Sequence, residues 1–185
     1  MVQSLWSEKL SSEAYVIWEA AQPLRHEFVN GDIFAMVGGT RQHETIALNL
    51  ASWLRNRLSG SPCRAYTAGM KVRVEAVNAY FYPDVFVTCS EKDHQASDYL
   101  TEPRLIIEVL SPSTEAYDRG DKFEKYRMLA SLEEYVLIDP DSRRIESFRK
   151  DPSGHWVLYE FRGQDGFTLA CVGVDIPMEE IFANL

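Results

Sequence analysis

The sequence lacks the long apolar runs and the leader pattern that mark membrane and secreted proteins. No apolar stretch approaches the ~20 residues that a membrane-spanning helix needs. The first residues, 1–8, contain no basic stretch followed by an apolar one, so we expect no secretory signal. These absences predict a protein that resides in the cytoplasm and has no membrane partner.

Cysteine is scarce and unpatterned. Cys63, Cys89 and Cys171 are scattered, odd in number and form no C-x-x-C pair. Disulfide frameworks use an even number of cysteines, and zinc clusters use closely spaced ones. Neither is therefore expected. The pair Gly38-Gly39 is followed by no P-loop lysine, which argues against a nucleotide site.

Positive charge is also in short supply. The chain has 28 acidic and 19 basic residues, and its formal net charge is −9. A protein that coats nucleic acid carries a basic face, so that class is excluded. An enzyme that meets DNA through a limited patch remains compatible with this charge, and its DNA binding would be sensitive to salt.

The length predicts one domain, residues 1–185, and the order of the expected helices and strands is typical of the α/β class with a mixed α+β sheet. Asn30-Gly31 separates two strand-like runs and favours a hairpin turn. The polar residues 90–101 are predicted to form a loop. The expected helices are 12–23, 40–58, 115–131 and 177–183. The expected strands are 25–29, 32–37, 63–67, 70–75, 82–89, 105–110, 134–140, 144–149, 155–162 and 167–174.

A single charge, Glu108, lies within the apolar strand predicted at residues 105–110. Side chains alternate along a strand, so Glu108 shares a face with Ile106 and Leu110. A carboxylate at such a position is costly unless it is paired, hydrogen-bonded or bound to a metal. A structural ion pair with Arg104 or a lysine is one alternative, but a functional role is favoured.

Asp84 is the natural partner of Glu108. It opens a predicted strand after Pro83, where it could serve merely as a turn residue. If the two strands are neighbours, both carboxylates meet at one end of the sheet. Such a pair suits a hard cation, Mg²⁺ or Mn²⁺.

These positions belong to a larger pattern. The pattern consists of Pro83-Asp84-Val85, Glu108-Val109-Leu110-Ser111-Pro112-Ser113, Asp118-x-x-x-Lys122-x-x-x-Tyr126 and Glu134-Tyr135-x-x-x-Asp139-Pro140, with weaker matches at Glu27-x-x-x-Gly31 and His43. The chain therefore resembles the Uma2 (DUF820) family of endonucleases in the PD-(D/E)xK superfamily. The resemblance implies a restriction-endonuclease-like core, in which a central mixed sheet is flanked by helices. An N-terminal hairpin and C-terminal antiparallel strands would accompany it.

The chain departs from the superfamily at one position. The lysine of the D/E-x-K triplet is replaced by Leu110. The resemblance implies a lysine relocated to the next helix, and Lys122 is preferred over Lys125. In a regular helix, Asp118, Lys122, Lys125 and Tyr126 would share one face. Lys122 could alternatively be a simple i,i+4 partner of Asp118.

Other candidates have competing interpretations. Glu27 is either a third acidic ligand or solvent-facing, and Asp118 is either an active-site residue or a helix N-cap. His43 is interpreted as a surface histidine, and Tyr126 as a core residue.

The resemblance implies a Mg²⁺- or Mn²⁺-dependent endonuclease that hydrolyses DNA. Asp84, Glu108, the carbonyl of Val109 and Glu27 would hold the metal, and Lys122 would complete the catalytic set. A homodimer is expected through residues 143–174, whose strands have an exposed edge. A catalytically weak or inactive module for binding or assembly is the alternative, and a hydrolase of small phosphoesters is a third hypothesis.

Overall fold

The computed structural model describes residues 9–36, 38–163 and 166–185. Residues 1–8, on which the absence of a secretory signal was argued, lie outside this set, as does Val37 at the end of an expected strand. The helices are α1 (Ser12–Ala20), α2 (Arg41–Arg57), α3 (Glu91–Gln95), α4 (Glu115–Tyr117), α5 (Phe123–Tyr126) and α6 (Met178–Ile181), with a 3-10 turn, η1 (Glu75–Val77), and a π turn, η2 (Asp118–Lys122). The strands are β1 (His26–Val29), β2 (Asp32–Ala35), β3 (Arg64–Thr67), β4 (Lys71–Val74), β5 (Ala79–Phe81), β6 (Val85–Thr88), β7 (Tyr99–Leu100), β8 (Pro103–Val109), β9 (Glu134–Asp139), β10 (Arg144–Lys150), β11 (Trp156–Phe161), β12 (Phe167–Leu169) and β13 (Val174–Ile176).

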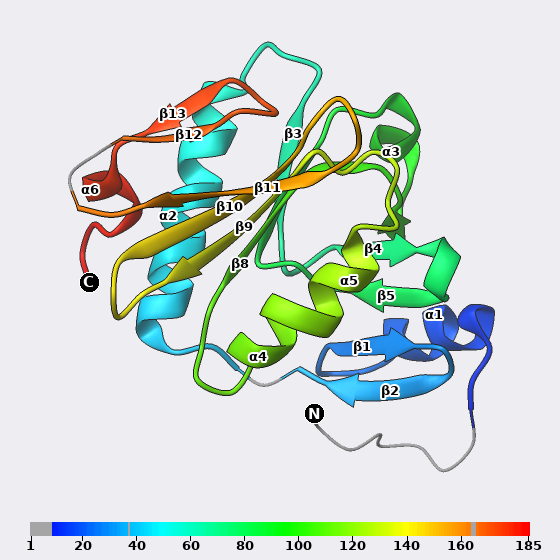
Figure 1. Cartoon of the computed structure of the whole chain (residues 1–185). Coiled ribbons are helices and arrows are strands. Elements are labelled where there is room, and N and C mark those ends of the chain that lie inside the picture. The colour runs from blue at the N-terminus through cyan, green and yellow to red at the C-terminus, as the bar shows by residue number, and fades with distance from the viewer. Residues whose placement is uncertain (1–8, 37, 164–165) are drawn as a thin grey trace.

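The strands form two larger sheets and one hairpin. The six-stranded sheet has the order β11-β10-β9-β8-β6-β3, and the five-stranded sheet has the order β2-β1-β5-β4-β7. Only β8 and β9 pair in parallel in the first sheet, and only β4 and β7 in the second. The predicted α/β fold with mixed sheets and flanking helices is confirmed (Figure 1).

The central strands β6, β8 and β9 of the six-stranded sheet are buried on both faces, which explains the apolar composition of β8. On one face, Leu105, Ile107 and Val109 of β8 pack with α2, α6 and the β12–β13 hairpin. On the other face, Ile106 and Leu110 join a second core with α5 (Figure 1). Glu108 therefore points toward α5, as the alternation along the strand predicted.

Local sequence signals account for the elements that approach the site. The β1–β2 turn has positive φ at Asn30 (48°) and Gly31 (98°), which the Asn-Gly pair tolerates well. Thr40 caps α2 by accepting a hydrogen bond from the amide of His43 at 3.3 Å. Both predicted elements are confirmed.

Several predicted boundaries were wrong. The expected loop at residues 90–101 contains α3 and β7, both too short to give a periodic signal. The expected strand at 167–174 is a hairpin of two short strands, β12 and β13. The helix expected to reach residue 131 ends at Tyr126, and its middle is the π turn η2.

Within the described residues, no helix combines the length and apolarity needed to cross a bilayer.

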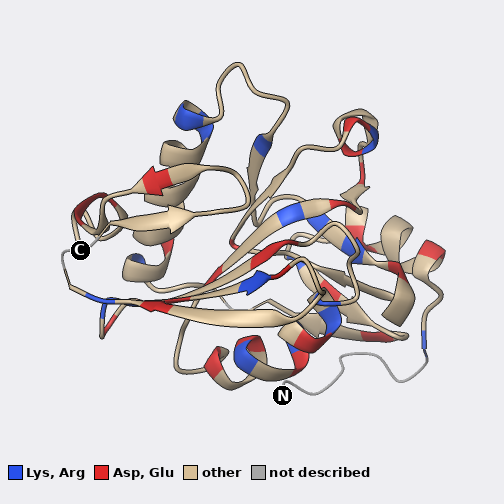
Figure 2. Ribbon diagram, turned by 45° about the horizontal axis from the view of Figure 1, so that its top comes forward, with Lys and Arg blue, Asp and Glu red and all other residues tan. Residues whose placement is uncertain are grey.

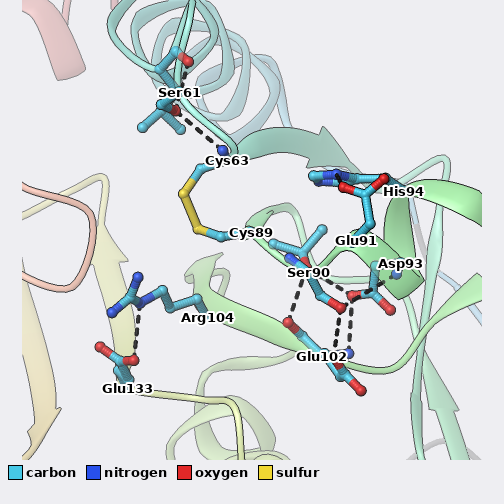
Figure 3. The surroundings of a disulfide bond; sticks show 12 residues. Ser61, Cys63, Cys89, Ser90, Glu91, Asp93, His94, Glu102, Arg104 and Glu133 are labelled. Carbon is cyan, nitrogen blue, oxygen red and sulfur yellow. Dashed lines mark hydrogen bonds and ion pairs between the residues drawn. A yellow bond between two sulfur atoms is a disulfide. The ribbon is translucent and has the colours of Figure 1, made fainter.

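The prediction of no disulfide was also wrong. Cys63 and Cys89 are bonded to each other (Figure 3). In the pairing of β3 with β6, Arg64 lies opposite Thr88, and this register brings together Cys63, just before Arg64, and Cys89, just after Thr88. The bond joins an edge strand of the six-stranded sheet to the strand that begins next to Asp84. Cys171 is free.

Candidate active site

Glu108 lies at the centre of a cluster of charged side chains between β8 and the α4–α5 segment. Its residue exposure is only 2%. Its Oε1 accepts a hydrogen bond from the Tyr126 hydroxyl at 3.1 Å and lies 3.0 Å from Lys122 Nζ. Its Oε2 accepts a hydrogen bond from the amide of Asp84 at 3.2 Å. The alternative pairing with Arg104 is wrong, because Arg104 pairs with Glu133 instead, whereas a pairing with a lysine agrees with the contact to Lys122.

The carboxylates of Asp84 and Glu108 each accept a hydrogen bond from the backbone of the neighbouring strand segment. β6 pairs with β8, and the amide of Val109 donates to Asp84 Oδ2 at 2.8 Å. In return, the amide of Asp84 donates to Glu108. The expectation that both carboxylates lie together at one end of neighbouring strands therefore agrees with the geometry.

Lys122 joins this cluster from η2. Its ammonium lies 3.0 Å from Glu108, 3.2 Å from Glu27 and 3.6 Å from Asp118. Lys125 does not take part, because its ammonium donates to the carbonyl of Asp121 at an exposed position. The expectation that Lys125 shares this face was wrong. A π turn has i→i+5 hydrogen bonds and so breaks the regular helical spacing on which that expectation was based.

Glu27 and Asp118 complete the acidic part of the cluster. The Glu27 side chain is only 13% exposed, and its Oε1 accepts a hydrogen bond from the amide of Tyr82 at 3.4 Å. Its solvent-facing interpretation was wrong. Asp118 is buried within the helical segment, so its interpretation as an N-cap was also wrong. Figure 2 shows acidic and basic residues alternating along this segment.

His43 is the residue that sequence reasoning missed. Its Nε2 lies 3.0 Å from Asp84 Oδ2, and its side chain is 15% exposed, so it is not a surface histidine. Its Nδ1 is buried and makes no hydrogen bond within the described residues. The family pattern included His43, but only the packing of α2 beside the start of β6 reveals its partner.

The cluster contains more carboxyl groups than basic side chains. Burial raises the pKa of Glu108 well above its usual range, and the charges of Asp84 and Asp118 add to this despite the attraction of Lys122. Burial likewise raises the pKa of Asp118. Burial alone would lower the pKa of Lys122, but Glu108 and Glu27 outweigh it and raise that pKa well above its usual range. Lys122 therefore stays protonated at neutral pH.

The pKa of His43 is also changed by its acidic neighbours. Its hydrogen bond with Asp84 raises the pKa of the imidazole, whereas burial opposes the shift. When protonated, the ring offsets part of the charge on Asp84.

The donor set fits a divalent cation chemically. Mg²⁺ and Mn²⁺ prefer carboxylate and carbonyl oxygens, and the carboxyl groups of Glu27, Glu108 and Asp118 gather here around one ammonium, with Asp84 beside them. Among the described residues, no three acidic, histidine or cysteine side chains already have the arrangement of a metal centre. Lys122, Tyr126 and backbone amides engage the carboxylates instead, so cation binding would require some of these contacts to open.

Comparisons with known proteins show the family of the chain. The model of the Uma2 family, described as "Putative restriction endonuclease", matches residues 12–179. Uncharacterized protein slr1290 from Synechocystis is 36% identical over 177 residues, covering 96% of this chain and 93% of that protein. A second uncharacterized Synechocystis protein, sll1609, is 30% identical over 158 residues, covering 84% of this chain and 89% of that protein.

A solved structure has the same fold. It is a crystal structure from Anabaena variabilis, described as a "putative nuclease belonging to DUF820". The TM-score is 0.76 at 14% identity, and the match covers 94% of this chain and 98% of that one. The family match spans nearly all of the described elements, so this chain belongs to the Uma2 family.

Proposed function

We propose that this protein is a Mg²⁺- or Mn²⁺-dependent endonuclease that hydrolyses phosphodiester bonds in DNA. Asp84 and Glu108, with the carbonyl of Val109 and with Glu27, would hold the cation. When bound, the cation supplies acidity to a water ligand and offsets negative charge on the phosphate. The family's description supports the reaction class, and the oxygen-rich donor set supports the choice of cation.

Lys122 has the role of orienting the attacking water and offsetting charge that develops on the phosphate. The observation that carries this proposal is the contact of its ammonium with Glu27, Glu108 and Asp118. Those carboxylates come from β1, β8 and η2, so three elements fix the position of the amine. Its raised pKa suits an electrostatic stabiliser rather than a general base.

His43 and Asp118 serve as positioning residues in this proposal. His43 Nε2 orients the carboxylate of Asp84, and Asp118 holds the Lys122 ammonium from the same helical segment. Residues that orient a ligand commonly change metal affinity when they are removed.

The net charge of the protein is compatible with DNA binding through a limited patch. Figure 2 shows Lys and Arg residues interspersed with Asp and Glu over the ribbon. With a formal net charge of −9, the protein would contact few phosphates, and its affinity for DNA would fall as salt rises.

A second candidate is a binding or assembly module with little catalysis. It is favoured by the engagement of both Glu108 oxygens, one by Lys122 and Tyr126 and the other by the amide of Asp84. Such a cluster satisfies much of its own hydrogen bonding without a metal. Calorimetric titration with Mn²⁺ separates the two candidates, because the module would show no uptake that depends on Asp84 and Glu108.

Nicking of supercoiled plasmid with Mg²⁺ or Mn²⁺ tests the leading proposal. Asp84→Asn and Glu108→Gln should each abolish nicking, since each removes one carboxylate while keeping its shape. Glu124→Gln is the matched control, because Glu124 is an exposed acid on α5. Cleavage that persists in both site variants removes the assignment. An RNA substrate and a small phosphodiester in the same assay define the substrate class.

A further inference from the structure

The outer edge of β11 is unpaired. β11 pairs with β10 along its whole length, from Trp156 opposite Lys150 to Phe161 opposite Ile145. In the described part of the chain, no strand lies along its other side. An antiparallel edge of this kind presents a row of free backbone N–H and C=O groups, which another strand can complete.

This edge carries the apolar residues that proteins usually keep away from edges. Val157, Leu158 and Tyr159 are consecutive and are 39%, 49% and 44% exposed. The opposite edge of the same sheet, β3, is shorter, and its two end residues, Arg64 and Thr67, are the exposed ones. Charged or short edges discourage pairing, whereas long apolar ones favour it. The longer, apolar edge at β11 therefore favours pairing with another strand, whereas the shorter edge at β3 does not.

Both faces of the β11 edge are held in place from within the chain. On one face, the Arg149 guanidinium lies 4.6 Å from the centre of the Tyr159 ring. On the other face, Leu158 lies opposite Phe148, whose ring packs 4.7 Å from that of Phe123. Tyr159 and the cross-strand neighbour of Leu158 therefore already have packing partners within the chain, which reduces the side-chain freedom that pairing would cost.

The local charge allows a second copy to approach here. Residues 143–162 contain five basic residues (Arg143, Arg144, Arg149, Lys150 and Arg162) and three acidic ones (Glu146, Asp151 and Glu160), a formal charge of +2. The whole chain has a formal charge of −9, so its acidic surplus lies elsewhere. In a two-fold contact the two regions of charge +2 face one another, while the acidic remainder of each copy stays farther from its partner.

We propose that β11 pairs with β11 of a second copy, in antiparallel orientation about a two-fold axis. The axis would stand perpendicular to the sheet, and the two six-stranded sheets would join into one continuous sheet. A two-fold contact uses the same patch on both copies, so Leu158 and Tyr159 of each copy face the other's β11. Such pairing satisfies the free backbone groups and covers the exposed apolar residues together.

The pairing has a consequence for the candidate sites, and this consequence alone rests on the proposed function. Between β8 of one copy and β8 of the other there would be seven strand spacings, or roughly 34 Å. Because the two β8 strands would run in opposite directions, the sites would lie at opposite ends of the joined sheet. Each site would therefore act alone, and plasmid cleavage would give nicked circles before linear DNA.

Sedimentation velocity of the full chain tests the pairing. The wild type should be dimeric, and Leu158→Lys should raise the dimer dissociation constant by at least about thirty-fold, since a charge then sits at the centre of the contact. Ile17→Lys is the matched control, because Ile17 on α1 is 76% exposed and lies away from the edge. A wild type that stays monomeric at high concentration overturns the proposal, as does a Leu158→Lys variant that dimerises like the wild type.

Hydrogen exchange of backbone amides identifies strand pairing directly. The outward-facing amides of β11 should exchange more slowly as protein concentration rises, whereas those at the β3 edge should not change. This readout stays informative even if a substitution disturbs folding, because it uses the unmodified chain. Equal exchange of the β11 amides in dilute and concentrated samples would exclude edge pairing even for a protein that dimerises.

Discussion

Lys122 Nζ lies 3.0 Å from Glu108 Oε1, although the two residues come from different elements. In the strand itself, position 110 shares the face of Glu108, and there the chain has Leu110, which packs into the core beneath α5. The ammonium group that a lysine at position 110 would supply is supplied instead by Lys122 of η2. The chain turns back after β8, so the helical segment covers the same face of the sheet (Figure 1).

Lys122→Met should reduce plasmid cleavage about a hundred-fold or more, because it removes the ammonium that stabilises the developing charge. Lys125→Met should leave cleavage unchanged, since the Lys125 ammonium donates to Asp121 at an exposed position. Initial rates of plasmid nicking at saturating Mg²⁺ give the comparison, with circular dichroism to confirm folding. Equal rates for both variants would show that Lys122 is merely structural.

The stability of the protein should fall as pH rises above the normal carboxyl range. Glu108 and Asp118 have folded-state pKa values raised above 4.5 and 3.8, the values of the free side chains, so the folded state retains protons that the unfolded state releases. The free energy of unfolding therefore decreases with pH between the unfolded and folded pKa values. His43, whose pKa is also raised, adds a decrease of the same sign above 6.5.

Urea denaturation in EDTA between about pH 4 and about pH 8 measures this slope. Glu108→Gln should flatten it, since the amide does not titrate, and Glu124→Gln should leave it unchanged. A wild type whose stability rises over the same interval would contradict the raised pKa values.

The sequence was sufficient for the parts of the site that depend on local patterns. Alternation along β8 placed Glu108 on the face of Leu110, and the Asn-Gly turn placed Glu27 on the first hairpin. The choice of Lys122 over Lys125 came from the family pattern rather than from periodicity. Its contact with three carboxylates could not be foreseen, because Glu27 reaches it from the other sheet.

The rest depended on contacts between distant elements. His43 meets Asp84 only because α2 packs beside the start of β6, and no sequence periodicity specifies that packing. Cys63 and Cys89 are 26 residues apart, and only the register of β3 against β6 places them opposite one another. β5 was missed because three residues carry too little pattern to distinguish a strand from a turn.

Loss of the Cys63–Cys89 disulfide should lower the free energy of unfolding by about 3.5 kcal/mol, the chain-entropy value for a closed loop of this length. The double variant Cys63→Ser with Cys89→Ser should match the reduced wild type in urea and should not respond to reductant. Cys171→Ser should keep the full loss of stability that reductant causes in the wild type. Burial and the nearby Glu134 raise the pKa of the Cys171 thiol, so it is a poor nucleophile for disulfide exchange. A double variant as stable as the oxidised wild type would show that the bond contributes nothing.

Gly39→Ala should weaken Mn²⁺ binding about ten-fold or more by displacing His43. A Cβ at position 39 would come within 2.6 Å of His43 Nδ1 and 2.7 Å of Glu44 Oε1, so we expect the imidazole ring to move and its contact with Asp84 to weaken. Gly38→Ala is the matched control, because a Cβ at that position meets nothing within 4 Å. Calorimetric titration with Mn²⁺ measures the affinity of the wild type and of both variants.

In a His43→Ala background, Gly39→Ala should have no further effect on this affinity, since both changes act through the same imidazole. An undiminished effect of Gly39→Ala in that background would mean that the loop, rather than His43, controls the binding of the cation.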